Sequence, residues 1–307
     1  MALDKSYFDY PHRSYGMDHD RYDWSMLSNR KPVQWPNGKK LALWVNVPLQ
    51  FFPLNQKGEP FKVPGGMTMP YPDLRHFSLR QYGNRIGIYR FLNAFDQYGI
   101  KPTFSMNTRL AEINPYLLNK ILERGDEISC HGYHMDAIHW SGLGKEAENE
   151  LIVKALEGLR KLTGQAVTGW LSPARNESAD TPDLLAANGI EYFSDWVNDD
   201  MPYEFRTSNG SLTAMPLTTE YEDRFVINGN QHSEDSWVDQ VCDAADFLRK
   251  EADTHGGRIL ALNIHPWLMG QPHRIAKLEE ALEYITEIDG IWPAYAGEIR
   301  NSWMAQQ

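Results

Sequence analysis

Two hydrophobic patterns alternate along the chain from residue 40 onward. Short continuous apolar runs are typical of buried strands, and between them apolar residues recur every three or four positions, as in amphipathic helices. The strand-like runs cover residues 39–52, 102–107, 126–132, 166–172, 190–194, 211–217, 256–265 and 291–295. The helix-like stretches cover residues 84–98, 114–124, 145–162, 181–188, 233–251, 274–288 and 296–303. The chain therefore alternates strand and helix throughout this region.

Residues at the expected helix ends support this interpretation. Asn114 followed by Pro115 is typical of a helix start, and Gly99, Gly125 and Gly164 come where helical spacing stops. Regular alternation predicts a parallel sheet with right-handed crossovers. The chain has about seven strand–helix units and no dinucleotide-binding fingerprint. We therefore predict an α/β fold, a (β/α) barrel rather than an open doubly wound sheet.

The sequence divides into an arm and one larger domain. Residues 1–38 are rich in Tyr, Asp, Pro and Arg and have no periodicity, so we predict an irregular N-terminal arm. Residues 39–307 form a single barrel domain in this prediction. The arm's aromatic residues favour packing, either on a neighbouring subunit, which would make the protein a homo-oligomer, or on its own domain. The proline- and glycine-rich stretch 53–80 is expected to be a long loop.

Composition narrows the possible partners. The 307 residues include 42% hydrophobic residues, enough for a sizeable core, and carry a net charge of −11. That charge argues against nucleic acid or an anionic membrane as the main partner and leaves a small-molecule substrate. No apolar run is long enough for a membrane span or a signal peptide, and only two cysteines occur. We expect a reducing, cytoplasmic location.

Reactive side chains gather where strands end. His131, Asp195 and His265 each follow an apolar run directly, and Arg175 follows a fourth. In parallel barrels the carboxyl ends of the strands meet at one mouth, which carries the chemistry. An imidazole with an ordinary pKa of about 6.5 suits proton transfer near neutral pH. We therefore predict that His131 and His265 share one site.

The segment around His131 leaves two interpretations open. Glu127, Ser129 and His131 share one strand face, whereas Cys130 points the other way and is expected to be a buried, inert thiol. Beyond the strand, His134, Asp136 and His139 would either complete a metal site or hydrogen-bond the loop backbone. Their loose spacing favours the second possibility.

Motifs absent from the chain exclude other chemistry. There is no G-x-S-x-G elbow, P-loop or G-x-G-x-x-G sequence, so neither serine acyl-enzyme nor nucleotide-dependent chemistry has support. Water-mediated hydrolysis remains the natural reaction for histidines and carboxylates in a cluster.

From about residue 40 to 300 the chain resembles the polysaccharide deacetylase (NodB-homology) family. The resemblance is carried, in order, by YGNRIGIYRFL, KPTFSMN, GDEISCHGYHMD, GWLSPARNES, IEYFSDWVNDDMPY and LNIHPWLMGQPHR. Within the family these motifs are most similar to the branch of cofactor-independent allantoinases and cyclic imide hydrolases. The resemblance implies a distorted seven-stranded barrel and hydrolysis of a carbon–nitrogen bond.

Two departures from the sugar deacetylases concern the metal. Their first motif carries carboxylates, whereas the corresponding strand here reads LALWVNVPLQ, with Asn46 or Gln50 in that region. Their second motif would place a histidine ligand at position 135, which is Met135. Neutral amides and one histidine hold a divalent metal weakly. We therefore expect either no cofactor or a weakly held divalent metal such as zinc, bound by His131 and His134.

These residues lead to a mechanistic hypothesis. Water attacks the carbonyl of a linear or cyclic amide, imide or ureide, while His131 and His265 handle protons and Asp195 orients one of them. Arg175 and Arg274 are expected to bind a carboxylate or ureide oxygen. Further substrate contacts are expected from Gln50, Trp196 and Trp267.

Two other functions remain open. The first is metal-dependent N-deacetylation of an acetylated carbohydrate, as the family name suggests. The second is a barrel without activity that only binds carbohydrate, which the missing first-motif carboxylates would also fit.

Overall fold

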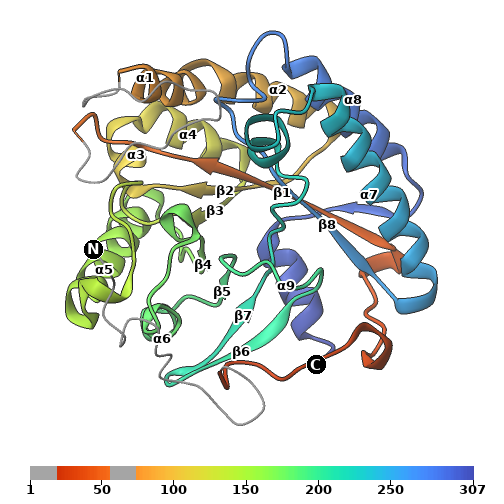
Figure 1. Ribbon diagram of the computed structural model, residues 1–307, viewed down its shortest axis with the longest axis horizontal. Coiled ribbons are helices and arrows are strands. Elements are labelled where there is room, and N and C mark those ends of the chain that lie inside the picture. The colour runs from red at the N-terminus through yellow and green to blue at the C-terminus, as the bar shows by residue number, and fades with distance from the viewer. Residues whose placement is uncertain (1–18, 56–73) are drawn as a thin grey trace.

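The computed structural model describes residues 19–55 and 74–307 as one curled sheet with helices around it (Figure 1). The strands are β1 Leu41–Leu49, β2 Pro102–Met106, β3 Glu127–Cys130, β4 Gly169–Trp170, β5 Tyr192–Phe193, β6 Tyr203–Thr207, β7 Gly210–Ala214, β8 Arg258–Asn263 and β9 Ile291–Pro293. The α-helices are α1 Leu74–Tyr82, α2 Ile88–Tyr98, α3 Thr108–Ile113, α4 Pro115–Arg124, α5 Lys145–Thr163, α6 Thr181–Ala187, α7 Glu234–His255, α8 Ile275–Glu287 and α9 Ala296–Met304.

The strands form one sheet in the order β6-β7-β5-β4-β3-β2-β1-β8, and β9 pairs with the first half of β1. Neighbouring strands are parallel, apart from the antiparallel hairpin of β6 and β7. In the part of the chain that the structure describes, β6 and β8 lie at the two ends of this order and do not pair with each other. The prediction of a distorted (β/α) barrel is therefore confirmed, in the form of an open half-barrel.

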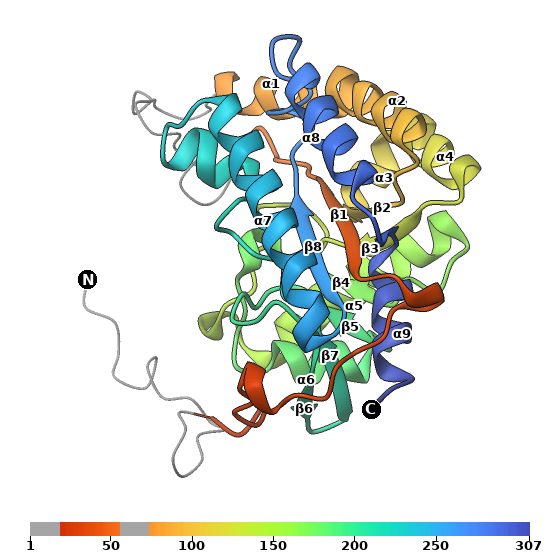
Figure 2. The same cartoon turned by 90° about the vertical axis from the view of Figure 1, so that its right-hand side faces the viewer.

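Strand β1 shows why the sheet has two cores. All nine of its residues are buried. Its odd-numbered side chains join the large cluster beneath the outer helices, whereas Ala42 and Trp44 join a smaller cluster on the inner face. Helix α9 covers that inner face with Ile299 and Trp303, which belong to the same smaller cluster. On the outside, α7 and α8 lie along the β8 side of the sheet (Figure 2).

Helix ends follow the sequence signals closely. The Asn114 side chain accepts a hydrogen bond from the Leu117 amide at 3.2 Å, and α4 ends at Gly125, which adopts a left-handed φ of 73°. One expectation was wrong: residues 74–82 form helix α1 instead of the end of a loop. This helix has few apolar residues, so its periodicity is weak in the sequence. Residues 56–73 of the expected loop lie outside the described residues.

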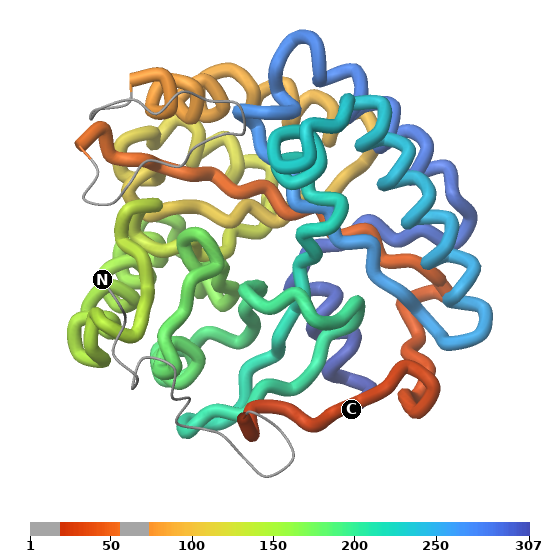
Figure 3. The backbone as a smooth tube through the Cα atoms, viewed as in Figure 1, coloured from red at the N-terminus to blue at the C-terminus, as the bar shows by residue number. Residues whose placement is uncertain are grey.

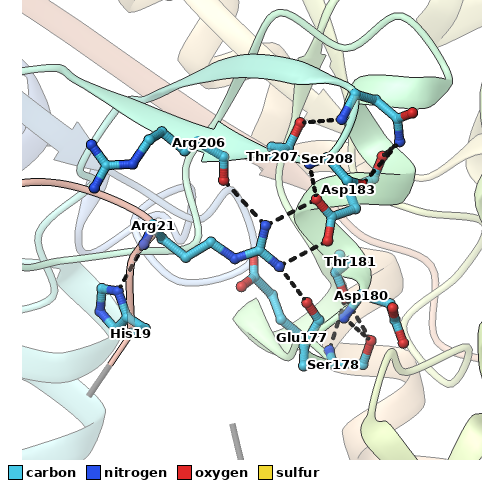
Figure 4. A network of polar contacts seen from close by, with 12 residues as sticks. His19, Arg21, Glu177, Ser178, Asp180, Thr181, Asp183, Arg206, Thr207 and Ser208 are labelled. Atoms are coloured by element: carbon cyan, nitrogen blue, oxygen red, sulfur yellow. Dashed lines mark hydrogen bonds and ion pairs between the residues drawn. The ribbon is translucent and has the colours of Figure 1, made fainter. Parts of the chain in front are cut away.

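The described part of the arm packs on its own domain. Its chain runs along the edge strand β6, where the Arg206 amide donates to the Arg21 carbonyl oxygen at 2.7 Å (Figure 3). The Arg21 guanidinium is buried and donates to both carboxylate oxygens of Asp183 at 2.9 Å and to the Ala179 carbonyl oxygen at 2.8 Å (Figure 4). The arm therefore covers the free edge of the sheet. Residues 1–18 lie outside the described residues, and no helix among the rest is long and apolar enough to span a membrane.

Candidate active site

A cavity of about 550 Å³ lies at the carboxyl ends of the parallel strands. Side chains reach it from the ends of β1, β3, β4 and β8 and from the segment that follows β7. Its lining comprises Pro48, Gln50, Phe52, Arg80, His131, Met135, Asp136, Ile138, Leu171, Ala174, Arg175, Thr219, Glu222, Arg224, Asn263 and His265. The strand-end argument thus accounts for most of the polar groups around it.

The inner face of the sheet changes from apolar to polar toward this cavity. On β1, Trp44 belongs to the inner core, whereas Asn46, two residues on, is a buried polar side chain. The Asn46 amide donates to Asn263 at 2.8 Å and accepts from the Ser105 hydroxyl at 2.7 Å. Ser105 in turn lies 2.8 Å from the hydroxyl of Ser129. This buried network supports the floor of the cavity and holds β1, β2, β3 and β8 in register.

His131 is held in one tautomer. Its Nδ1 atom lies 2.7 Å from the Leu171 carbonyl oxygen, so Nδ1 carries the proton and donates. Its Nε2 atom then accepts, 3.3 Å from the Gln50 amide nitrogen. Burial lowers the pKa of His131 to about 4, because a charged imidazole would lose its solvation. His131 is therefore a neutral acceptor near pH 7.

His265 forms a short contact with a buried carboxyl group. Its Nδ1 atom lies 2.7 Å from Oδ1 of Asp223, and its backbone amide donates to Oδ2 of the same carboxylate, also at 2.7 Å. Both side chains are buried, 3% and 0% exposed. Burial lowers the pKa of His265 and raises the pKa of Asp223, since each charged form loses solvation. In neutral His265 the proton is on Nδ1, which donates to Asp223. The other nitrogen, Nε2, is therefore unprotonated and can accept a proton.

Three arginines add positive charge beside the two imidazoles. Arg175 and Arg224 each donate to one oxygen of the buried Glu222 carboxylate, at 3.0 Å. Oε1 of Glu222 also lies 4.0 Å from Nε2 of His265. The third, Arg80, reaches the cavity from α1. The sequence interpretation had singled out only Arg175 among these three.

Asp195 does not have the neighbours that the sequence suggested. Its Oδ1 atom accepts from the Ser172 amide at 2.7 Å, and its carboxyl group hydrogen-bonds to that of Glu177. The carboxylate that contacts a histidine is Asp223 instead. Asp223 lies within the segment that connects β7 to α7 and does not directly follow a strand, so the strand-end argument did not single it out.

Three of the expected substrate contacts, Arg274, Trp196 and Trp267, are not among the lining residues of the cavity. Arg274 pairs with Glu234 at 2.6 Å and borders a second cavity of about 240 Å³. Trp196 donates from its indole nitrogen to Glu177 at 3.1 Å and packs against Phe205. Trp267 also borders the second cavity, and its ring centroid lies 5.7 Å from that of His265. The Trp267 ring therefore packs against the imidazole of His265 in a T-shaped contact.

The predicted metal ligands do not come together as a set. His134 is outside the cavity lining, and its Nδ1 atom accepts from the Asp136 amide at 3.2 Å. The cavity lining includes Met135 and Gln50, and the Gln50 amide nitrogen lies 3.3 Å from Nε2 of His131. Across residues 19–55 and 74–307, no three His, Cys, Asp or Glu side chains are grouped to hold a metal ion. A neutral amide and a thioether do not fit the divalent metal of the sugar deacetylases.

The remaining candidates are structural. His139 is buried, 3.3 Å from the carboxylate of Glu148, which also accepts from the Ser178 hydroxyl. Cys130 lies in the outer core, where burial raises the pKa of its thiol to about 12. Neither side chain lines the cavity.

Known proteins share part of this sequence. Residues 85–193 match the sequence model described as polysaccharide deacetylase. A Schizosaccharomyces pombe protein named "Putative polysaccharide deacetylase" is 26% identical over 90% of this chain and 95% of its own length. A peptidoglycan deacetylase of Helicobacter pylori is 24% identical over 73% of this chain and 85% of its own.

Solved structures share the whole fold. The Puue allantoinase has a TM-score of 0.82 with 24% identity, covering 91% of this chain and 95% of its own. A Pseudomonas aeruginosa protein described as a "probable Polysaccharide deacetylase" has a TM-score of 0.78 with 25% identity, covering 91% and 96%. Residues 85–193 thus match the polysaccharide deacetylase family, as the motifs in this region predicted, and enzymes of that family hydrolyse carbon–nitrogen bonds.

Proposed function

We propose that this protein hydrolyses a carbon–nitrogen bond in a small linear or cyclic amide, imide or ureide. His265, held by Asp223, acts as the general base that takes a proton from the attacking water. The observation that carries the proposal is the buried contact of 2.7 Å between His265 Nδ1 and Asp223 Oδ1 at a cavity that His131 also lines. Such a pair fixes the tautomer and leaves Nε2 as the proton acceptor.

His131 has a different role in this proposal. Its proton is committed to the Leu171 carbonyl oxygen, so it presents an acceptor to the cavity and positions the attacking water. Donors to the developing oxyanion come from the Gln50 amide and the Arg175 guanidinium, which both line the cavity. Donors aimed at the developing charge are worth a large share of the rate enhancement.

The donor atoms favour this chemistry over metal-dependent removal of acetyl groups from sugars. A metal-activated water needs a site with carboxylate and imidazole ligands. Among residues 19–55 and 74–307, no three His, Cys, Asp or Glu side chains are grouped to form such a site. The names of the curated relatives favour the deacetylase alternative, so the test includes it.

The test is a ring-opening assay with hydantoin, a cyclic ureide, and succinimide, a cyclic imide. A parallel assay measures acetate released from N-acetylated chito-oligosaccharides with and without added zinc. Ring opening is expected to lose about 10²- to 10⁴-fold in kcat when His265→Asn removes the base. The exposed His273→Asn is the matched control and keeps full activity. Zinc-dependent acetate release without ring opening would overturn the proposal in favour of the deacetylase.

A further inference from the structure

We propose that Asp195 is a positioning residue for His131 and acts on it through the peptide group between Leu171 and Ser172. His131 donates from Nδ1 to the carbonyl oxygen of this peptide at 2.7 Å, and Asp195 Oδ1 accepts from its N–H, also at 2.7 Å. The imidazole and the carboxylate therefore hold the two polar groups of one rigid, planar unit. In this role His131 is the residue that positions the attacking water, so the inference rests on the proposed function.

The peptide between Leu171 and Ser172 lies just beyond the end of β4. The Leu171 amide still donates to the Cys130 carbonyl oxygen at 2.9 Å, which continues the pairing of β4 with β3. The Leu171 carbonyl oxygen and the Ser172 amide are instead bonded to the two side chains. Two residues further on, Ala174 and Arg175 adopt left-handed φ values of 58° and 54°, which residues other than glycine hold only where their surroundings impose them. The carboxylate is thus one of the groups that fix the plane of this peptide at the start of a strained turn.

The Asp195 carboxylate strengthens the hydrogen bond of His131. A negative charge on the N–H side of a peptide makes its carbonyl oxygen a better acceptor, because hydrogen bonds in a chain polarise one another. A stronger acceptor keeps the imidazole proton on Nδ1 and keeps the ring in one orientation. Nε2 then remains an acceptor at the cavity, 3.3 Å from the Gln50 amide nitrogen. Asp195 is not among the lining residues, so its effect on a substrate passes through His131.

Glu177 keeps the negative charge on Asp195. The two carboxyl groups hydrogen-bond to each other, and Glu177 Oε1 and Asp195 Oδ2 are buried without another partner. Burial and the Asp195 charge raise the pKa of Glu177 well above its ordinary value. Glu177 therefore holds the shared proton and donates to Asp195, while its Oε2 atom accepts from the Trp196 indole at 3.1 Å. Both oxygens of Asp195 are then engaged, and its charge lies beside the Ser172 amide.

The first measurement is made on the imidazole of His131 and needs no turnover. Two-dimensional ¹H–¹⁵N NMR of protein labelled with ¹⁵N-histidine reports which nitrogen of each ring carries the proton, and the His131 signals are those missing from His131→Gln. In the wild type at pH 7 the proton is expected on Nδ1, with a downfield signal. Asp195→Ala removes the acceptor of the Ser172 amide and should move this signal upfield. Asp195→Asn keeps an acceptor oxygen but loses the charge, so it should move the signal the same way by less, and it replaces the alanine variant if that does not fold.

Ring opening of hydantoin gives the second measurement. Asp195→Ala is expected to lower kcat about three- to tenfold, the effect of one hydrogen bond, with little change in KM because the residue lies outside the lining. Asp126→Asn is the matched control. This buried carboxylate accepts from Arg124 and Tyr295 and lies just before β3, at the end of that strand opposite His131. Its substitution should leave the His131 signal and kcat unchanged even where stability falls.

An unchanged Nδ1–H signal in the folded Asp195 variants, or a wild-type His131 with its proton on Nε2, would overturn the inference. Equal losses of kcat in Asp195→Ala and Asp126→Asn would also overturn it, since stability alone would then explain both. The expected NMR shifts in a protein that opens neither hydantoin nor succinimide would count against the proposed function alone.

Discussion

Gly87 and Pro266 approach each other so closely that a Cβ atom on Gly87 would lie 2.0 Å from the Pro266 carbonyl oxygen. The φ of Gly87 is −57°, so its backbone is one that any residue adopts, and only space requires glycine. The contact presses the start of α2 against the segment that directly follows His265. This explains why the YG-x-R-x-G motif, far from His265 in sequence, accompanies the histidine motif.

Gly87→Ala should therefore destabilise the protein by about 3 kcal/mol, since the added methyl group meets backbone that cannot move alone. Urea unfolding followed by tryptophan fluorescence measures the change. Gly229→Ala is the control, because its nearest contact would be 3.7 Å and ordinary. Equal stability of the two variants would contradict the packing argument.

Asp223→Asn should lower kcat for ring opening by about 10²- to 10⁴-fold with little change in fold. Asp223 accepts from the backbone amide of His265 with one oxygen and from its Nδ1 with the other. An amide has one acceptor oxygen, so one of these donors loses its partner or the imidazole changes tautomer. Steady-state kinetics measure the loss of kcat, and circular dichroism checks that the fold is retained.

Asp195→Asn is the informative comparison, because the sequence alone suggested this residue as the partner of a histidine. Asp195 accepts from the Ser172 amide and shares a hydrogen bond with Glu177, so its kcat effect should be much smaller. A larger loss in Asp195→Asn than in Asp223→Asn would reverse the assignment.

The strand-end argument could bring His131, His265 and Arg175 to one mouth because it depends only on parallel topology. The partners of these residues could not be predicted in the same way. Asp195 comes just after β5, whereas Asp223 lies further along the segment between β7 and α7, so the choice between the two carboxylates depends on the path of that segment in space. Local sequence has no information about such distances.

Arg80 shows a second limit of the sequence. It lies in α1, whose apolar residues are too few to predict a helix, and the stretch around it is rich in proline and glycine. What makes Arg80 noteworthy is its contact with Trp267, which comes from a segment 187 positions later in the chain. Long-range stacking of this kind has no periodic signature.

Acid should weaken the fold through His131. Its pKa is about 4 in the folded protein and about 6.5 when unfolded, so its stabilising contribution is complete above pH 6.5 and declines as pH falls toward 4. Between pH 7 and pH 5 this histidine should account for a loss of about 2 kcal/mol. Urea unfolding of His131→Gln should therefore change less with pH than wild type. His273→Gln, at an exposed position, should behave like wild type, and parallel curves for all three would contradict the effect.

Removal of divalent metals should leave ring opening unchanged. Among the described residues no three His, Cys, Asp or Glu side chains are grouped to hold a metal, and the Gln50 amide beside His131 is a poor ligand for zinc. Activity is measured before and after dialysis against a chelator, with the metal content determined on the same samples. Loss of activity that zinc restores would show that the donor set is larger than these residues suggest.

Alkaline pH should weaken the fold through a different pair, Glu177 and Asp195. Their buried carboxyl groups hydrogen-bond to each other, which requires one shared proton. Burial and the neighbouring Asp195 charge raise the pKa of Glu177 well above its ordinary value. The folded state therefore binds this proton more tightly, and stability is lost as pH rises through the folded pKa, by about 1.4 kcal/mol per pH unit at most. Glu177→Gln donates from an amide without a titrating proton, so its melting temperature should fall less between pH 6 and pH 10 than that of wild type or of the exposed control Glu150→Gln. Identical pH profiles for the three proteins would show that the pair does not share a proton.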